Sequence, residues 1–259
     1  MRDLKITLVQ RMLHWEDAAA NRSQFQEVMA PLRGATDLIV LPEMFTTGFS
    51  MRSIELAETM DGATVRWMRE QARALDAALY GSVIIQEAGE CYNRGLFVTP
   101  EGRVATYDKR HLFRFANETE HYSAGRERVV VEWRGWRILL QICFDLRFPV
   151  FARNRGDYDA ILYVANWPEA RRFPWSQLLI ARAIENQCYV AGVNRVGMDG
   201  KGIHYSGDSV VIDPRGAAQT AVEPSLEGVL TTTLDRAGLE DFRAKFPVAL
   251  EADDFDLRL

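Results

Sequence analysis

The sequence predicts an α/β protein in which short strands alternate with amphipathic helices. Two continuous apolar runs, Asp37–Leu41 and Asp159–Ala165, are typical of strands buried on both faces of a sheet. Apolar residues recur at helical spacing over residues 25–32 and again over residues 65–79. The chain has 259 residues, 47% of them apolar and 26% charged, which is long enough for one large core.

In the first half, each element is predicted from its periodicity and from the turn residues beside it. The short alternating segment Leu4–Val9 predicts a strand, and Pro31 is expected to end or kink the first helix. The second helix is expected after Asp61-Gly62, with an apolar stripe at Val65, Met68, Ala72, Leu75 and Leu79. Short strands are expected at Gly81–Gln86, Gly95–Val98 and Arg103–Tyr107, with a hairpin turn at Pro100–Gly102 between the last two.

The second half repeats this alternation. Strands at Val129–Trp133 and Trp136–Cys143 flank an Arg134-Gly135 turn, and a short helix is expected after Phe148. The segment Trp175–Gln187 predicts a helix that is apolar around much of its circumference, which suggests burial on a second side at a subunit interface. The sheet is expected to be completed by strands at Tyr189–Val196, Asp208–Ile212 and Gly228–Leu234.

Composition and charge exclude several classes of protein. No linker or repeat divides the chain, so a single domain over residues 1–259 is expected, with the acidic segment 247–259 either frayed or docked on a partner subunit. A net charge of −5 argues against nucleic-acid binding, and no apolar run is long enough to span a membrane. The segment Met1–Gln10 lacks the pattern of a signal peptide, and the three cysteines lack disulfide or zinc spacing. A cytoplasmic protein with free thiols is expected.

Familiar catalytic motifs are absent from the sequence. It contains no GxSxG, HExxH or Walker A pattern, and its four histidines are not spaced as a metal pair. The glycine-rich stretch Gly197–Gly202 lies in the wrong context for a dinucleotide site and predicts a surface turn. Neither a metal nor an organic cofactor is expected.

Three reactive residues follow three predicted strands. Glu43 comes just past Asp37–Leu41, Lys109 follows Arg103–Tyr107, and Cys143 lies where a strand meets a helix. Each alone has an ordinary explanation, as a cap, a surface lysine or a core cysteine. Because sites in α/β sheets collect at the carboxyl ends of strands, the three are expected to meet. Together they supply the base, the cation and the nucleophile of acyl transfer through a thioester.

The segments that hold these residues resemble the nitrilase superfamily of carbon–nitrogen hydrolases. The matching segments are Pro42–Met44, Lys109–Phe113 and Ile142–Pro149, in the order and spacing of the superfamily, and the resemblance covers nearly the whole chain. It implies a four-layer αββα sandwich that dimerises into an eight-layer body.

The resemblance also implies roles for individual residues. Glu43 would be the general base, Cys143 the nucleophile and Lys109 the partner of the oxyanion. A second glutamate of the superfamily corresponds best to Glu118, although Ala124 stands where the superfamily usually has proline.

A mechanism follows from these residue types. A thiol with a pKa of about 8.5 is mostly protonated at neutral pH, so Glu43 is expected to accept its proton. Lys109 and the N-terminus of the following helix are expected to favour the thiolate. Lys109 and the backbone N–H of Phe144 are the expected donors to the oxyanion.

Two further stretches, Asn166–Pro168 and Ala181–Gln187, resemble the omega-amidase branch most. That resemblance implies hydrolysis of the terminal amide of 2-oxoglutaramate or 2-oxosuccinamate. The same triad serves N-carbamoyl hydrolases, nitrilases and other aliphatic amidases. A non-catalytic scaffold, or a redox sensor at Cys143, is the alternative from a different class.

An α-keto acid substrate requires a cation for its carboxylate, and arginine suits this task because its planar group pairs with both oxygens. The loop after Asp159–Ala165 offers Arg171 or Arg172 for this contact, and Trp167 or Phe173 as a wall of the pocket. Both arginines could instead be solvated or paired with acidic residues.

Overall fold

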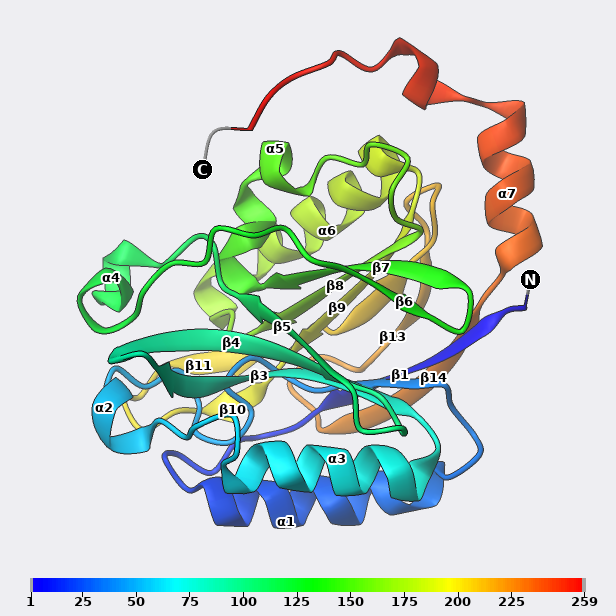
Figure 1. Cartoon of the computed structure of the whole chain (residues 1–259). Coiled ribbons are helices and arrows are strands. Elements are labelled where there is room, and N and C mark those ends of the chain that lie inside the picture. Colours follow the sequence, from blue (N-terminus) through cyan, green and yellow to red (C-terminus); the bar gives the residue numbers. More distant parts are fainter. Residues whose placement is uncertain (1, 258–259) are drawn as a thin grey trace.

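Two six-stranded sheets packed face to face form the centre of the computed structural model, which describes residues 2–257 (Figure 1). Helices α1 and α3 cover the outer face of one sheet, and α5 and α6 cover the outer face of the other (Figure 1). The protein therefore has the four-layer αββα arrangement.

The first sheet has the strand order β14-β1-β2-β3-β4-β5, with β1, β2 and β3 parallel. Its strands are β1 (Leu4–Gln10), β2 (Leu38–Val40), β3 (Ala78–Glu87), β4 (Glu90–Val98), β5 (Val104–Asp108) and β14 (Gly228–Leu234). The helices of this half are α1 (Ala18–Met29), α2 (Ser53–Leu56) and α3 (Ala63–Leu75).

The second sheet has the order β13-β12-β9-β8-β7-β6, with β7, β8 and β9 parallel. Its strands are β6 (Val130–Trp133), β7 (Trp136–Ile142), β8 (Ala160–Ala165), β9 (Tyr189–Asn194), β12 (Val210–Ile212) and β13 (Ala218–Ala221). The remaining strands, β10 (Val196–Met198) and β11 (His204–Ser206), form a small ribbon. The other helices are α4 (Glu118–His121), α5 (Pro149–Ala152), α6 (Arg172–Asn186) and α7 (Arg236–Lys245).

The central strands are buried on both faces, as their continuous apolar runs predict. In β2 and just beyond it, Leu38 and Val40 belong to the core between the sheets, whereas Ile39 and Leu41 pack in the core under α1 and α3. Alternate side chains of a strand point to opposite faces, so one apolar run serves both cores.

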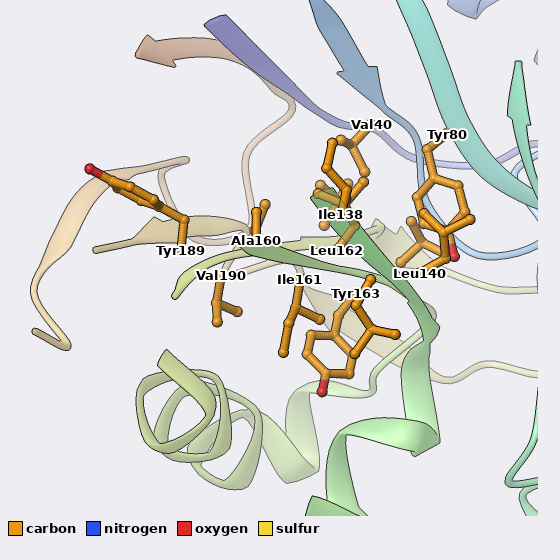
Figure 2. Packing of buried hydrophobic residues seen from close by; sticks show 14 of the residues in the cluster. Val40, Tyr80, Ile138, Leu140, Ala160, Ile161, Leu162, Tyr163, Tyr189 and Val190 are labelled. Carbon is orange, nitrogen blue, oxygen red and sulfur yellow. The ribbon is translucent and has the colours of Figure 1, made fainter. Parts of the chain in front are cut away.

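The core between the sheets continues across both of them. Val40 and Tyr80 of the first sheet lie against Ile138 and Leu140 of the second, while Ile161 points to the opposite side, toward the helices (Figure 2). This packing fixes the two sheets relative to each other, and with them the strand ends that carry the candidate catalytic residues.

Most predicted elements are confirmed, several strands with shifted bounds, and the following differences affect the architecture. Helix α3 ends at Leu75, where Asp76 adopts a left-handed conformation, so Leu79 belongs to β3 and not to the helical stripe. Helix α6 begins at Arg172 and not at Trp175. Strand β14 pairs with β1, so it completes the first sheet and not the sheet that contains β9 and β12.

Turn residues behave as their chemistry predicts. Helix α1 ends at Met29, immediately before a 3-10 turn that contains Pro31. The Arg134-Gly135 turn has two positive φ angles, 50° and 83°, which is the geometry of a tight hairpin. The glycine-rich stretch Gly197–Gly202 runs from β10 into the turn that leads to β11.

Helix α6 buries one face in the chain and leaves part of the other uncovered. Trp175, Leu179 and Ala183 are buried, whereas Ile184 is 52% exposed and Ile180 is partly exposed. The second buried side expected from the sequence is therefore not provided by this chain.

Part of the C-terminal segment contacts its own chain, and docking of this segment on a partner subunit stays a prediction. The Arg155 guanidinium lies 4.5 Å above the ring of Phe255, and Leu257 packs against the larger core. The rest of the predicted tail, residues 258–259, lies outside the described residues.

Within residues 2–257, no helix has the length and apolar character needed to cross a membrane.

Asp159 links the second sheet to α7. Its buried carboxylate accepts hydrogen bonds from Arg137 and Arg243 and forms an ion pair with Arg236. Burial alone would raise the pKa of Asp159, but the hydrogen bonds from Arg137 and Arg236 hold it well below its usual range.

We predict that Asp159→Asn lowers the free energy of unfolding by about 3 kcal/mol at pH 7, because it leaves three arginines without their shared counter-charge. The depressed pKa contributes stability above about pH 4 that is lost as the pH falls, so the difference from the wild type should shrink in acid. Urea unfolding from pH 7 to pH 3 measures both effects. Equal stability at pH 7 would contradict the prediction.

Candidate active site

The structure brings together the four residues that the sequence suggests for catalysis. The Nζ atom of Lys109 lies 2.9 Å from Oε1 of Glu43 and 3.0 Å from both carboxylate oxygens of Glu118. Glu43 and Lys109 follow β2 and β5 of the first sheet, whereas Cys143 follows β7 of the second. The site therefore lies between the two sheets, at the carboxyl ends of their strands.

Sharp turns carry the candidate residues Glu43 and Cys143. Met44, next to Glu43, has a φ of 42°, and Cys143 itself has a φ of 46°. Such left-handed conformations cost about 1 kcal/mol or more for residues other than glycine, so the surrounding structure must hold them. Ser82 of β3 does so for the first turn, because its Oγ accepts a hydrogen bond of 2.8 Å from the Met44 N–H.

Both carboxylate oxygens of Glu43 accept hydrogen bonds. Its Oε1 accepts from Lys109 and from Nδ2 of Asn93, at 2.7 Å for the asparagine, and its Oε2 accepts from the Asn166 backbone N–H at 2.8 Å. The side chain of Asn166 also donates to the Glu43 carbonyl. Glu43 is thus held in one orientation in a fully buried position.

Lys109 forms salt bridges with the carboxylates of Glu43 and Glu118 at once. None of the three side chains is accessible to solvent. Burial alone would lower the pKa of Lys109, but the charges of Glu118 and Glu43 raise it above its ordinary value. Burial, and then the charge of Glu43, raise the pKa of Glu118 against the opposing effect of Lys109. The lysine therefore stays an ammonium ion.

The environment of Cys143 favours the neutral thiol. Burial and then the negative charge of Glu43 raise the pKa of the Cys143 thiol well above its ordinary value, and Lys109 opposes them without prevailing. Lys109 acts in the expected direction, toward the thiolate, but burial and the charge of Glu43 outweigh it. The helix expected to act with it is only a five-residue 3-10 turn, Cys143–Arg147.

A cavity of about 500 Å³ opens onto Cys143 and Lys109. Its walls are mainly aromatic, formed by Phe49, Phe113, Phe115, Phe144, Trp167 and Tyr205. The other charged side chains that line it are Arg114, Arg147 and Arg171. No acidic side chain lines this cavity among the described residues, so its wall favours an anionic ligand.

The structure separates the residues proposed for substrate binding. Trp167 and Arg171 line the cavity, and the Arg171 guanidinium lies 5.2 Å above the ring of Phe113. Arg172 instead pairs with Asp208 at 2.5 Å, and Phe173 is 72% exposed. Neither lines the cavity, because α6 begins at Arg172 and its first turn directs both side chains away.

Several site residues were not predicted. Asn93 lies within β4, where its type and spacing give no sign of a catalytic contact. Arg147 falls inside the recognised segment Ile142–Pro149, but no role was inferred for it. Tyr205 comes from the short β11, which periodicity did not reveal. Across residues 2–257, no group of His, Cys, Asp and Glu side chains is arranged to hold a metal ion.

The chain belongs to the carbon–nitrogen hydrolase family, whose family model matches residues 5–244. The αββα fold is therefore that of a carbon–nitrogen hydrolase.

The chain is also similar to individual proteins that are named as amidases. The chain is 50% identical to omega-amidase YafV of Escherichia coli, over 99% of this chain and 100% of that protein. It is 34% identical to 2-oxoglutaramate amidase of Bacillus subtilis, over 82% of this chain and 83% of that protein.

Among solved structures, it is similar to XC1258 of Xanthomonas campestris, a CN-hydrolase superfamily protein with an arsenic adduct in its active site. That similarity has a TM-score of 0.98 and 53% identity, and it covers 100% of both chains.

We predict that a small thiol reagent such as iodoacetamide modifies Cys143 before the other two cysteines, because Cys143 lines the cavity beside the base Glu43. Cys188 is fully buried, Cys91 is 6% exposed, and neither lines this cavity. Peptide mapping after stoichiometric labelling identifies the site, with Cys143→Ala as the control. Faster labelling of Cys91 or Cys188 would indicate that Cys143 is an ordinary buried cysteine of the core.

Proposed function

We propose that this protein is an omega-amidase that hydrolyses the terminal amide of a short α-keto acid, such as 2-oxoglutaramate, and releases ammonia. The observation that carries the proposal is the buried cluster of Glu43, Lys109 and Cys143 beside a cavity whose charged lining residues are all cations. The similarity to proteins named omega-amidase and 2-oxoglutaramate amidase supports the same substrate class.

In the first half of the proposed reaction, Sγ of Cys143 attacks the amide carbon. Because the resting thiol is protonated, its proton passes to Glu43 as the C–S bond forms. The carbonyl oxygen becomes an oxyanion, which accepts hydrogen bonds from Lys109 and from the N–H of Phe144. That N–H lies in the first turn after Cys143, where a helix leaves its donors without internal acceptors. One such donor is worth about 3 kcal/mol in the transition state.

In the second half, the tetrahedral intermediate collapses and the C–N bond breaks. Glu43 returns its proton to the leaving nitrogen, and ammonia departs from a thioester on Cys143. Glu43 then accepts a proton from water, which attacks the thioester carbon, and the thiol regains that proton as the acid leaves. Glu118 holds Lys109 throughout, so the ammonium remains in place when Glu43 is protonated. Side chains and the backbone N–H of Phe144 supply every group, so the proposed reaction needs no metal or organic cofactor.

The substrate carboxylate is assigned to the arginines of the cavity wall. Arg171 and Arg147 both line it and contact aromatic rings, those of Phe113 and Trp167. Among residues 2–257, neither arginine forms a salt bridge with an acidic side chain, so both guanidinium groups are available to an anion. Arg172 is excluded from this role by its ion pair with Asp208.

The apolar face that α6 leaves uncovered supports a homodimer. Ile184 is 52% exposed, and Val150 of the neighbouring α5 is 54% exposed. A second copy would cover this face, and the segment 247–257, which runs from α7 toward α5, would lie at the edge of that interface (Figure 1).

We place this single-domain enzyme in the cytoplasm, where a thiol nucleophile stays reduced.

We predict that Glu43→Gln and Lys109→Ala each reduce kcat more than 100-fold, on the order of the contribution of a positioned acid–base group or charge. The glutamine is near-isosteric and cannot accept the proton of Cys143, so substrate should still bind. Ammonia release under steady-state conditions measures the loss. Near-normal turnover of Glu43→Gln would refute the role of Glu43 even if Cys143 proved essential.

We predict that Arg171→Ala raises KM for 2-oxoglutaramate about 10-fold or more, because it removes a charge-assisted contact worth roughly 1.5–3 kcal/mol. Arg172→Ala is the matched control and should change KM little, since Arg172 lies outside the cavity. A neutral amide without a carboxylate should distinguish these variants much less. Equal losses on the charged and the neutral substrate would contradict carboxylate binding by Arg171.

A further inference from the structure

Asp145 is a fully buried carboxylate that the proposed mechanism does not use. Its Oδ2 accepts hydrogen bonds from the Tyr107 hydroxyl at 2.7 Å and from the Ile142 N–H at 2.9 Å. Its Oδ1 accepts from the His111 N–H at 3.0 Å and lies 2.8 Å from Nδ1 of the same histidine. Four polar groups therefore converge on one carboxylate.

The partners of Asp145 flank the reactive residues in the sequence. Tyr107 and His111 lie two positions before and two positions after Lys109, and Ile142 immediately precedes Cys143. Lys109 follows a strand of the first sheet and Cys143 a strand of the second. One carboxylate thus ties the turn that carries the cation to the turn that carries the nucleophile.

Aromatic packing also holds His111 against the segment that follows Cys143. The His111 imidazole stacks on the ring of Phe148, with centroids 3.8 Å apart and planes 6° from parallel, and meets the edge of Phe151. The N–H of Phe148 donates to the backbone carbonyl of Asp145 at 3.0 Å. The imidazole is therefore fixed in the orientation that its contact with Asp145 requires.

We propose that Asp145 is a positioning residue that sets the place of the Lys109 ammonium relative to the thiol of Cys143. This inference rests on the roles proposed above for those two residues. Misplacement of a catalytic group by about 1 Å can cost roughly 100-fold in rate, and the two turns come from different sheets, so a direct link between them controls that distance.

Asparagine at position 145 would keep the shape of the side chain but lose this function. If its amide group faces Tyr107 and Ile142, the Ile142 N–H has no acceptor; if it faces His111, the His111 N–H has none. A buried donor without a partner destabilises the observed arrangement, so the two turns would separate.

The test is Asp145→Asn, with Asp159→Asn as the matched control, since Asp159 is an equally buried carboxylate at the other end of the second sheet. We expect Asp145→Asn to lower kcat about 100-fold with KM within about 2-fold, because the carboxylate contact is assigned to Arg171, which comes from a different segment of the cavity wall. Asp159→Asn should lower stability without changing kcat per titrated active site. Wild-type kcat in Asp145→Asn would overturn the inference.

Two further measurements separate positioning from a general structural effect. Alkylation of Cys143 by iodoacetamide does not form an oxyanion, so its rate should change less than about 3-fold in Asp145→Asn. In a Lys109→Ala background, Asp145→Asn should add little further loss, because its effect passes through Lys109. Parallel loss of alkylation and turnover, or multiplied losses in the double variant, would overturn the inference.

Tyr107→Phe removes a single hydrogen bond to Asp145, so it tests the link even if Asp145→Asn does not fold. It should lower kcat about 10-fold with unchanged KM, in line with one charge-assisted hydrogen bond, and an unchanged kcat would contradict the inference. These comparisons can use any amide that the wild type hydrolyses. A wild type that is active only on other amides would refute 2-oxoglutaramate as the substrate and leave the comparison of variants valid.

Discussion

The ammonium of Lys109, shared between the carboxylates of Glu43 and Glu118, is the interaction on which the site depends. Removing such charges from water costs several kcal/mol for each ion, so the arrangement is stable only where every charge has partners. Asn93, the Asn166 N–H and the Phe113 N–H supply the remaining donors to the two carboxylates. Each donor belongs to a different segment, and the surrounding strands and turns must therefore occupy fixed positions.

The sandwich provides those positions because its two sheets contribute different parts of the chemistry. Glu43 and Lys109 follow strands of the first sheet, and Cys143 follows a strand of the second. The apolar core between the sheets resists sliding, since close-packed interiors are not freely deformable. Burial has a second effect, because it raises the pKa of the Cys143 thiol. In the proposed reaction, deprotonation of this thiol by Glu43 is therefore coupled to attack on the substrate.

Much of this protein could be predicted from local pattern. The buried strands, the end of α1 before Pro31 and the convergence of Glu43, Lys109 and Cys143 follow from apolar runs, proline chemistry and strand-end placement. Errors occurred where periodicity was ambiguous. Leu79 continues the helical stripe in spacing, yet a left-handed residue at Asp76 ends the helix first. Local sequence also placed Arg172 in a loop, although it begins α6.

The local sequence determined the alternation of strands and helices and pointed to Glu43, Lys109 and Cys143 as candidate site residues, because apolar periodicity and residue chemistry are local properties of the chain. The four layers were implied by the resemblance to the nitrilase superfamily and not by periodicity. Only the tertiary structure decided which groups surround these three residues. Three features depend on groups brought together from distant segments. They are the raised pKa of Cys143, the position of Arg171 and not Arg172 in the cavity wall, and the contacts of Asn93 and Asp145. Desolvation and hydrogen-bond geometry act over a few ångströms in space, whatever the separation of the residues in the chain.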